Sequence, residues 1–211
     1  DYSIFIGQFY VGLLILWTIL ISFGYIFLKK DVFRLMRVVR EPTMLAFATA
    51  SSESAYPKTM EALDKFGVPK RITSFVLPLG YSFNLDGSMM YMAFAVLFIA
   101  QAYNIDLSFT QQALILLTLM ITSKGIAGVS RASIVVIAST LAMFKLPEAG
   151  ILLILAVDQF LDMGRTATNV IGNSIATAVI ARTEGNKHDL PEEEGVVVDT
   201  IVPVNRLADN S

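Results

Sequence analysis

The sequence has no cysteine and a single histidine, His188, among its 211 residues. Disulfide bonds, thiolate metal sites and cysteine nucleophiles are therefore excluded for this chain. Charged residues are also scarce, because they make up 16% of the chain where soluble domains carry about 25%. Hydrophobic residues make up 55% and the mean hydropathy is +0.62, which is typical of a membrane protein. The net charge of −2 indicates no nucleic-acid partner.

Long apolar runs account for much of this composition. Residues 2–28 contain no charged side chain and are long enough for a membrane-spanning helix, which takes about 20 residues. A basic stretch follows directly, so the positive-inside rule places that end in the cytoplasm. Residues 72–105 and 149–182 are also long enough to span, and the polar residues 184–211 are expected to form a cytoplasmic tail. Because the chain begins at Asp1 and enters a hydrophobic run at once, we expect it to be the C-terminal part of a longer protein.

Three interruptions lie within the other apolar stretches. "SSES" and "SKGIAGVSRAS" each join two short arms that reach only part of the way across a core of about 30 Å. They predict two re-entrant hairpins, one entering from the cytoplasm and one from outside. "LPLGYSFNLDGS" predicts a broken helix within 72–105. Backbone without helical hydrogen bonds cannot face lipid, so the three interruptions indicate one transporter-like binding site in mid-membrane.

The last apolar run carries a polar stripe. At 100° per residue, five polar side chains between positions 158 and 173 fall within an arc of about 80° if no break occurs at Gly164; they are Asp158, Asp162, Arg165, Asn169 and Asn173. The guanidinium of Arg165 matches a carboxylate and Asp162 matches an ammonium, so the stripe suits an acidic amino acid. Thr166 and Asn169 can hold an α-carboxylate or a hydroxyl. The alternative is an internal Asp–Arg ion pair that only orients helices.

The interruptions supply further candidate groups. The hydroxyls of Ser51 and Ser52, with the backbone N–H groups freed at a short helix end, suit an anion. The alternative there is small-residue packing between helices. Asn84 and Asp86, with carbonyls freed by the helix break, suit a sodium ion. The alternative for these two is a kink stabilised by local side-chain hydrogen bonds.

Taken together, "SSESAYP", "GYSFNLDGS", "SKGIAGVSRAS" and "DQFLDMGRTATNVIGN", in this order, resemble the dicarboxylate/amino acid:cation symporter family. The family includes glutamate and aspartate transporters and bacterial C4-dicarboxylate transporters. The resemblance covers residues 1–183 and is nearest to bacterial members that carry glutamate with protons and sodium. It implies no enzymatic activity, no covalent cofactor, and Na⁺ or H⁺ as coupling ions.

The resemblance also implies an architecture: a transport domain with inverted repeats that moves by an elevator motion in a bacterial inner membrane. The partners it implies are the lipid bilayer, the substrate and two further copies of the chain, joined as a homotrimer through a scaffold absent from these residues. The implied segments are transmembrane helix 6 at 1–29, hairpin 1 at 30–69, helix 7 at 70–106 with an interruption at 80–88, hairpin 2 at 107–148, helix 8 at 149–183 and the tail at 184–211.

The resemblance carries roles over by position. Substrate contacts are implied for Ser51, Ser52, Val129, Asp162, Arg165, Thr166 and Asn169. One cation site is implied at Gly80, Asn84 and Asn169, with Asn173 beside it, a second at Ser82, Ser123 and Ile126, and a third at Asp86.

Two positions depart from the sodium-driven pattern. Many sodium-driven members have an aspartate where this chain has Asn173, and Lys124 places a positive charge beside the second cation site, where it would repel sodium. Proton coupling with fewer sodium ions is therefore an alternative, with Asp162 or Asp86 as candidate proton carriers.

These features predict a symporter that carries L-glutamate or L-aspartate into the cell. A C4-dicarboxylate symporter is the nearest alternative, but succinate offers no ammonium to Asp162. Glutamate and aspartate differ by one methylene group, which changes the binding free energy by only about 1–3 kcal/mol, so the sequence leaves the choice between them open. A channel would not need a site matched to both carboxylate and ammonium. An intramembrane hydrolase using Ser51 or Ser52 would lack a histidine or helically spaced lysine as its base.

Overall fold

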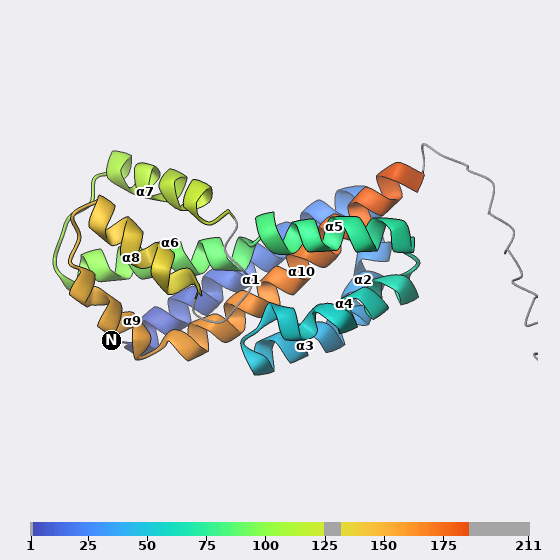
Figure 1. The fold of residues 1–211 in the computed structure, drawn as a ribbon, viewed down its shortest axis with the longest axis horizontal. Helices are drawn as coiled ribbons and strands as arrows, with labels where there is room; N and C mark the ends of the chain where they lie inside the picture. The colour runs from blue at the N-terminus through green and yellow to red at the C-terminus, as the bar shows by residue number, and fades with distance from the viewer. Residues whose placement is uncertain (1, 125–131, 186–211) are drawn as a thin grey trace, which may run out of the picture.

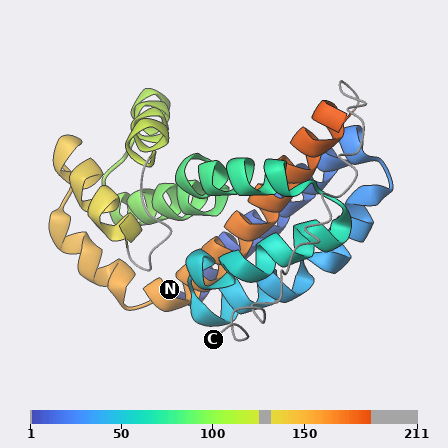
Figure 2. The same ribbon diagram turned by 45° about the vertical axis from the view of Figure 1, so that its right-hand side comes forward.

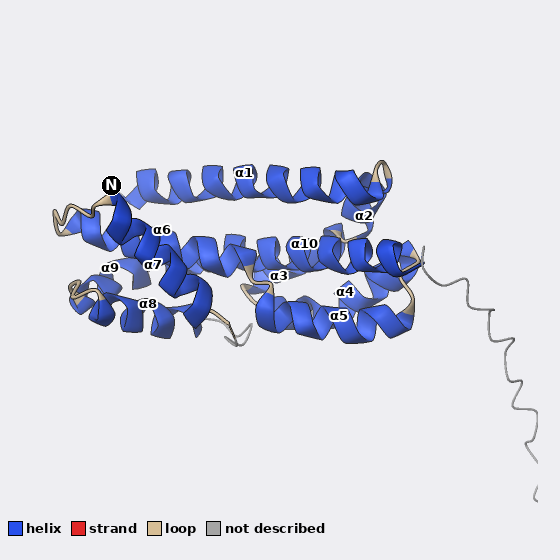
Figure 3. Ribbon diagram, turned by 90° about the horizontal axis from the view of Figure 1, so that it is seen from above, coloured by secondary structure: helices blue, strands red, loops and turns tan. Residues whose placement is uncertain are grey.

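The computed structural model describes residues 2–124 and 132–185, and every regular element within them is a helix. The elements are drawn in Figure 1, and Figure 3 shows helices joined by loops, with no strand in the described part of the chain. Their bounds are α1 Tyr2–Leu28, α2 Asp31–Val38, α3 Arg40–Thr49, α4 Ser52–Phe66, α5 Lys70–Phe83, α6 Asp86–Ala102, α7 Phe109–Thr122, α8 Ala132–Met143, the 3-10 helix η1 Glu148–Gly150, α9 Ile151–Leu155 and α10 Asp158–Gly185. The prediction of an all-α protein is confirmed over these ranges.

Helix α10 is the central element of the fold. It contacts α1, α3, α4, α5 and α6 along its length, and α1 runs beside it in both Figure 1 and Figure 3. Helix α1 is apolar throughout and most of its side chains are exposed. By length and hydropathy it is one of two candidate membrane spans among the described residues, the other being Lys70–Ala102. One side of α1 therefore packs on α10, while the remainder suits a lipid environment.

The second candidate span is broken in the middle. Helix α5 continues through Pro78 and ends at Phe83, and α6 begins at Asp86. Only Asn84 and Leu85 leave the helical conformation, with φ/ψ of −111°/70° and −108°/63°. The break is thus shorter than the interruption expected at 80–88, because the Asn84 N–H still donates to the Gly80 carbonyl at 2.7 Å. The final span is also divided, since α9 and α10 are separate helices.

Two helical hairpins approach the centre of the molecule from its two ends (Figures 1 and 2). The first consists of α3 and α4, joined at Ala50, whose φ of 49° is left-handed, and at Ser51, whose side chain caps α4. The second consists of α7 and α8. Helix α7 begins at a capping box formed by Ser108 and Gln111. Residues 125–131, which follow Lys124 in the sequence, lie outside the described ranges.

Two apolar cores lie on either side of the polar part of α10. One is built from α1, α6, α7, α8 and α9 and includes Leu161. The other is built from α2, α4, α5 and the later part of α10 and includes Ile171 and Ile175. The polar residues 162–169 therefore lie where these two cores meet, beside the hairpin ends and the helix break.

Candidate functional site

The polar stripe predicted on the last helix is buried. Helix α10 continues without a break through Gly164, so the stripe stays on one helix. Each of its five members is 1–2% exposed, and so is the neighbouring Thr166; the members are Asp158, Asp162, Arg165, Asn169 and Asn173. A buried charged group is costly unless it is paired or hydrogen-bonded, so the partners of these side chains indicate what the site can hold.

Arg165 connects three helices. Its guanidinium forms an ion pair with Asp162 on the preceding turn of α10. Its Nη1 donates to the Ser133 hydroxyl of α8 at 2.8 Å and to the Ser88 hydroxyl of α6 at 3.4 Å. Among the described residues, its Nε has no hydrogen-bond acceptor. The side chain is thus held in position by neighbours but retains a buried donor for a further acceptor.

Asn169 caps the second half of the broken helix. Its side-chain oxygen accepts from the N–H groups of Gly87 at 2.9 Å and Ser88 at 3.3 Å, and its Nδ2 donates to the Ser88 hydroxyl at 3.0 Å. The first N–H groups of a helix have no intrahelical acceptor. A side chain from another helix therefore satisfies the N-terminus of α6 and couples the break to α10.

The first hairpin is bonded to the same turn of α10. The Ser52 hydroxyl donates to the Thr166 carbonyl at 3.3 Å, and the Thr166 hydroxyl donates to the Ala46 carbonyl at 2.9 Å. Ser51 lies one residue away, where its side chain accepts from the Ser54 N–H at 3.4 Å as the cap of α4. Both hairpins therefore contact α10 at consecutive residues, Arg165 and Thr166.

The helix break brings together Gly80, Asn84 and Asn173 of the first predicted cation site, whereas Asn169 is bonded to Gly87 and Ser88. Asn84 Nδ2 donates to Asn173 Oδ1 at 3.2 Å. A Cβ added at Gly80 would lie 2.5 Å from the same oxygen, so only glycine allows this approach. Asp86 points at α10, because its Oδ2 would lie 2.7 Å from a Cβ added at Gly172.

The second set is not assembled to the same degree. The Ser82 hydroxyl donates to the Pro78 carbonyl at 3.3 Å within α5. The Ser123 hydroxyl donates to Met89 Sδ at 3.1 Å and to the Met120 carbonyl at 3.3 Å. Ile126, as well as Val129 of the substrate set, lies outside the described ranges. Within those ranges no three histidine or carboxylate side chains form a cluster suited to a metal ion.

Comparison with known proteins identifies the family. The model of the sodium:dicarboxylate symporter family matches residues 1–183. The chain belongs to this family. It is 50% identical over 165 residues to a proton/sodium-glutamate symport protein of Bacillus caldotenax, covering 78% of this chain and 38% of the relative. It is 51% identical over 154 residues to a proton/glutamate-aspartate symporter of Escherichia coli (strain K12), covering 73% and 35%. A C4-dicarboxylate transport protein of Paracoccus denitrificans is 43% identical over 186 residues, covering 85% and 40%.

The resemblance inferred from the motifs is therefore confirmed, including the likeness to proton/sodium–glutamate symport proteins. Members of the symporter family are transporters rather than enzymes, which agrees with the expectation that the serines at the first hairpin are not nucleophiles. The chain spans about two fifths of the length of the curated relatives it matches.

Sequence reasoning missed three side chains that bond to the buried polar stripe in this member of the symporter family. Ser88 and Ser133, which bond to Arg165, are the last residues of two motifs already recognised by their small and polar character. Tyr91 donates to Asp158 Oδ1 at 2.5 Å and ties α6 to the first turn of α10. The signal for Tyr91 was weak, because a tyrosine in an apolar helix is typical of packing as well as of hydrogen bonding.

Proposed function

We propose that this chain forms the substrate-carrying part of a secondary active symporter for L-glutamate or L-aspartate. The observation that carries the proposal is Arg165, a buried guanidinium that is paired with Asp162 and bonded to α6 and α8, and whose Nε has no acceptor among the described residues. Such a group is expensive to bury and is expected to be functional inside a membrane.

The two charges of the pair match the two kinds of charge on the substrate. Arg165 binds the side-chain carboxylate, and Asp162 binds the ammonium group. Thr166 and Asn169 assist, together with Ser51 and Ser52 of the first hairpin and the Val129 backbone of the second. When substrate is absent, Arg165 and Asp162 neutralise each other, which keeps the empty site stable.

Sodium, protons or both drive the transport. Sodium ligands are proposed at Gly80, Asn84, Asn169, Asn173, Ser82, Ser123, Ile126 and Asp86. The proximity of Gly80, Asn84 and Asn173 supports a site at the helix break. The uncharged Asn173 weakens that site for a cation, so fewer sodium ions with proton coupling fit this chain better than sodium alone.

The chain works within a larger membrane protein. Its described helices move together in an elevator motion against a trimeric scaffold in the bacterial inner membrane, with the second hairpin as the outer gate and the C-terminal tail in the cytoplasm. The central position of α10, bonded to both hairpins, supports movement as one body.

A C4-dicarboxylate symporter is the second candidate, because relatives of that name are 42–49% identical to this chain. The buried Asp162 favours the amino acid, since succinate would leave its carboxylate without an ammonium partner.

The test uses the full-length protein reconstituted into proteoliposomes. We expect uptake of radiolabelled L-glutamate that responds to imposed sodium or pH gradients and is unaffected by excess unlabelled succinate. Uptake that succinate abolishes, or no uptake of glutamate with uptake of succinate, would replace the amino-acid assignment by the C4-dicarboxylate one. Flux that neither saturates nor follows an ion gradient would contradict a symporter altogether.

A further inference from the structure

Lys124 reaches across to the end of the broken helix. It follows α7 and the helix-capping residue Ser123, and its Nζ donates to the Phe83 carbonyl at 2.7 Å. Phe83 is the last residue of α5, 41 positions earlier in the sequence. The contact therefore joins the second hairpin to the helix break.

The carbonyl that Lys124 contacts is one that attracts cations. The last carbonyls of a helix have no intrahelical donor, and the helix dipole gives that end a partial negative charge. Asp86 begins α6 three residues after Phe83 and adds a carboxylate. Asp86 and Lys124 both line a cavity of about 530 Å³, which is bounded otherwise by apolar side chains and glycine from α1, α6 and α7.

The Phe83 carbonyl that Lys124 contacts lies within the second candidate membrane span, Lys70–Ala102. Helix α5 has 14 residues, so Phe83 lies about 21 Å along it at 1.5 Å per residue. In a membrane crossed by Lys70–Ala102, this carbonyl lies within the hydrocarbon core of about 30 Å, and the Lys124 ammonium lies beside it. A charge at such a depth is costly and needs compensation, which here comes from the helix-end carbonyl and the nearby carboxylate.

We propose that the ammonium group of Lys124 takes the place of a coupling sodium ion beside the helix break. This ammonium group holds the position at the C-terminal end of α5 that a sodium ion would otherwise occupy, and it thereby lowers the number of sodium ions that bind before substrate moves. The proposal rests on the proposed symport function, and it makes Lys124 a residue that determines ion specificity.

The first test measures sodium binding without transport. The full-length protein is purified, and its thermal stability is followed as sodium chloride replaces choline chloride at constant ionic strength, without substrate. A ligand that binds the folded state raises the melting temperature with its concentration. We expect Lys124→Met to need at least tenfold less sodium for half-maximal stabilisation than the parent, whereas Lys124→Arg, which retains the charge, stays near the parent.

Lys65→Met is the matched control, because Lys65 is an exposed lysine of α4 distant from the helix break. It should respond to sodium as the parent does. Identical sodium responses in the parent and Lys124→Met would overturn the proposal. So would a sodium response in Lys124→Arg equal to that of Lys124→Met, because side-chain shape rather than charge would then be the cause.

A chemical variant covers the case in which Lys124→Met does not fold. The 211 residues contain no cysteine, so Lys124→Cys can be modified selectively, in a full-length background whose other cysteines have been replaced. An aminoethyl disulfide restores an ammonium, and a methyl disulfide does not. We expect the aminoethyl form to respond to sodium as the parent does and the methyl form to bind sodium more tightly; equal responses would reject a role for the charge.

Uptake separates this proposal from the proposed function. If parent protein transports neither glutamate nor succinate, the symport function fails whatever the sodium response. If it transports, Lys124→Met should show a sodium Hill coefficient larger by about one. A changed sodium affinity with an unchanged coefficient would reject the claim about ion number.

Discussion

Arg165 illustrates how a single side chain organises the site. It is 1% exposed, and it contacts Asp162 on its own helix, Ser88 on α6 and Ser133 on α8. A lysine in its place would keep the charge but lose the planar fork that allows these contacts at once. The arginine therefore both binds and holds together the elements around the substrate.

Asp162→Asn should change substrate choice. The substitution keeps the shape of the side chain and removes the negative charge proposed to bind ammonium. A hydrogen bond to a charged group is worth about 1.5–3 kcal/mol, so the KM for L-glutamate should rise by about 10- to 100-fold. Uptake of radiolabelled glutamate measures the KM, and the same assay with unlabelled succinate measures competition. Succinate should inhibit glutamate uptake more strongly in Asp162→Asn than in the parent. Asp106→Asn, at an exposed loop position, is the control; an unchanged glutamate KM in Asp162→Asn would reject the ammonium role.

Asn169→Ala should lower stability because it removes the acceptor for the Gly87 and Ser88 N–H groups. Loss of a helix cap costs about 0.5–2 kcal/mol. Thermal unfolding of the purified protein measures the effect, with Gln101→Ala as an exposed amide control on α6, the helix that Asn169 caps. If Asn169→Ala unfolds like the parent, the cap is not a stabilising contact.

At the scale of elements, the close approach of α6 to α10 depends on Gly87. A Cβ at this position would lie 2.2 Å from the Arg165 carbonyl oxygen and 2.9 Å from Thr168 Cβ. Because the first contact is to a backbone atom, a side chain at position 87 fits only if α6 and α10 move apart. The approach of the two helices is what places Ser88 against Arg165 and Asn169.

Gly87→Ala is therefore expected to destabilise the protein by about 1–3 kcal/mol, the usual range for overpacking. It should also reduce substrate affinity, because α6 must move away from α10. Thermal unfolding and uptake measure the two effects. Gly7→Ala in α1 is the control, since nothing lies within 4 Å of its added Cβ, and there alanine should stabilise by up to about 1 kcal/mol. Equal behaviour of the two variants would show that the helix approach is not tight.

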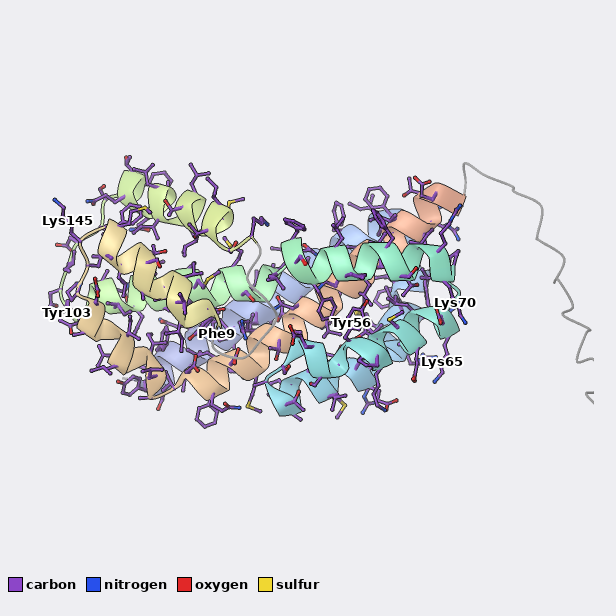
Figure 4. All side chains as sticks on the ribbon, in the orientation of Figure 1. Phe9, Tyr56, Lys65, Lys70, Tyr103 and Lys145 are labelled. Carbon is purple, nitrogen blue, oxygen red and sulfur yellow. The ribbon has the colours of Figure 1, made fainter. Side chains whose placement is uncertain are left out.

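At the scale of the whole molecule, the basic stretch at residues 29–40 marks one end of the long axis. Lys65 and Lys70 lie at one end of the long axis and Tyr103 and Lys145 at the other (Figure 4). The basic stretch that precedes α3 belongs to the same end as Lys65, as the position of α2 in Figure 1 shows. The positive-inside rule therefore predicts that the Lys65 end faces the cytoplasm.

Cysteine accessibility tests this orientation in a full-length background whose other cysteines have been replaced. In intact cells, a membrane-impermeant maleimide should label Tyr103→Cys and leave Lys65→Cys unlabelled, because the two positions lie on opposite sides. In permeabilised cells both should be labelled, which controls for reactivity. Labelling of both positions in intact cells, or of Lys65→Cys alone, would refute the predicted orientation.

Much of this protein was determined by local sequence. The apolar run at the start predicts α1, the "LPLGYSFNLDGS" interruption predicts a broken helix, and the spacing of Asp162, Arg165 and Asn169 predicts a common face. These follow from chain-local physics, namely helical periodicity and the cost of placing polar groups in an apolar run.

Only the tertiary structure decided which groups complete the site. Ser88, Ser133 and Tyr91 act through contacts 32 to 77 residues away in the sequence, and Lys124 reaches a carbonyl 41 residues away. No periodicity encodes such pairs, because they depend on how closely α6, α8 and the second hairpin pack against α10 and the helix break. The sequence thus determined which residues are polar, buried and helical, whereas packing between helices determined which of them meet.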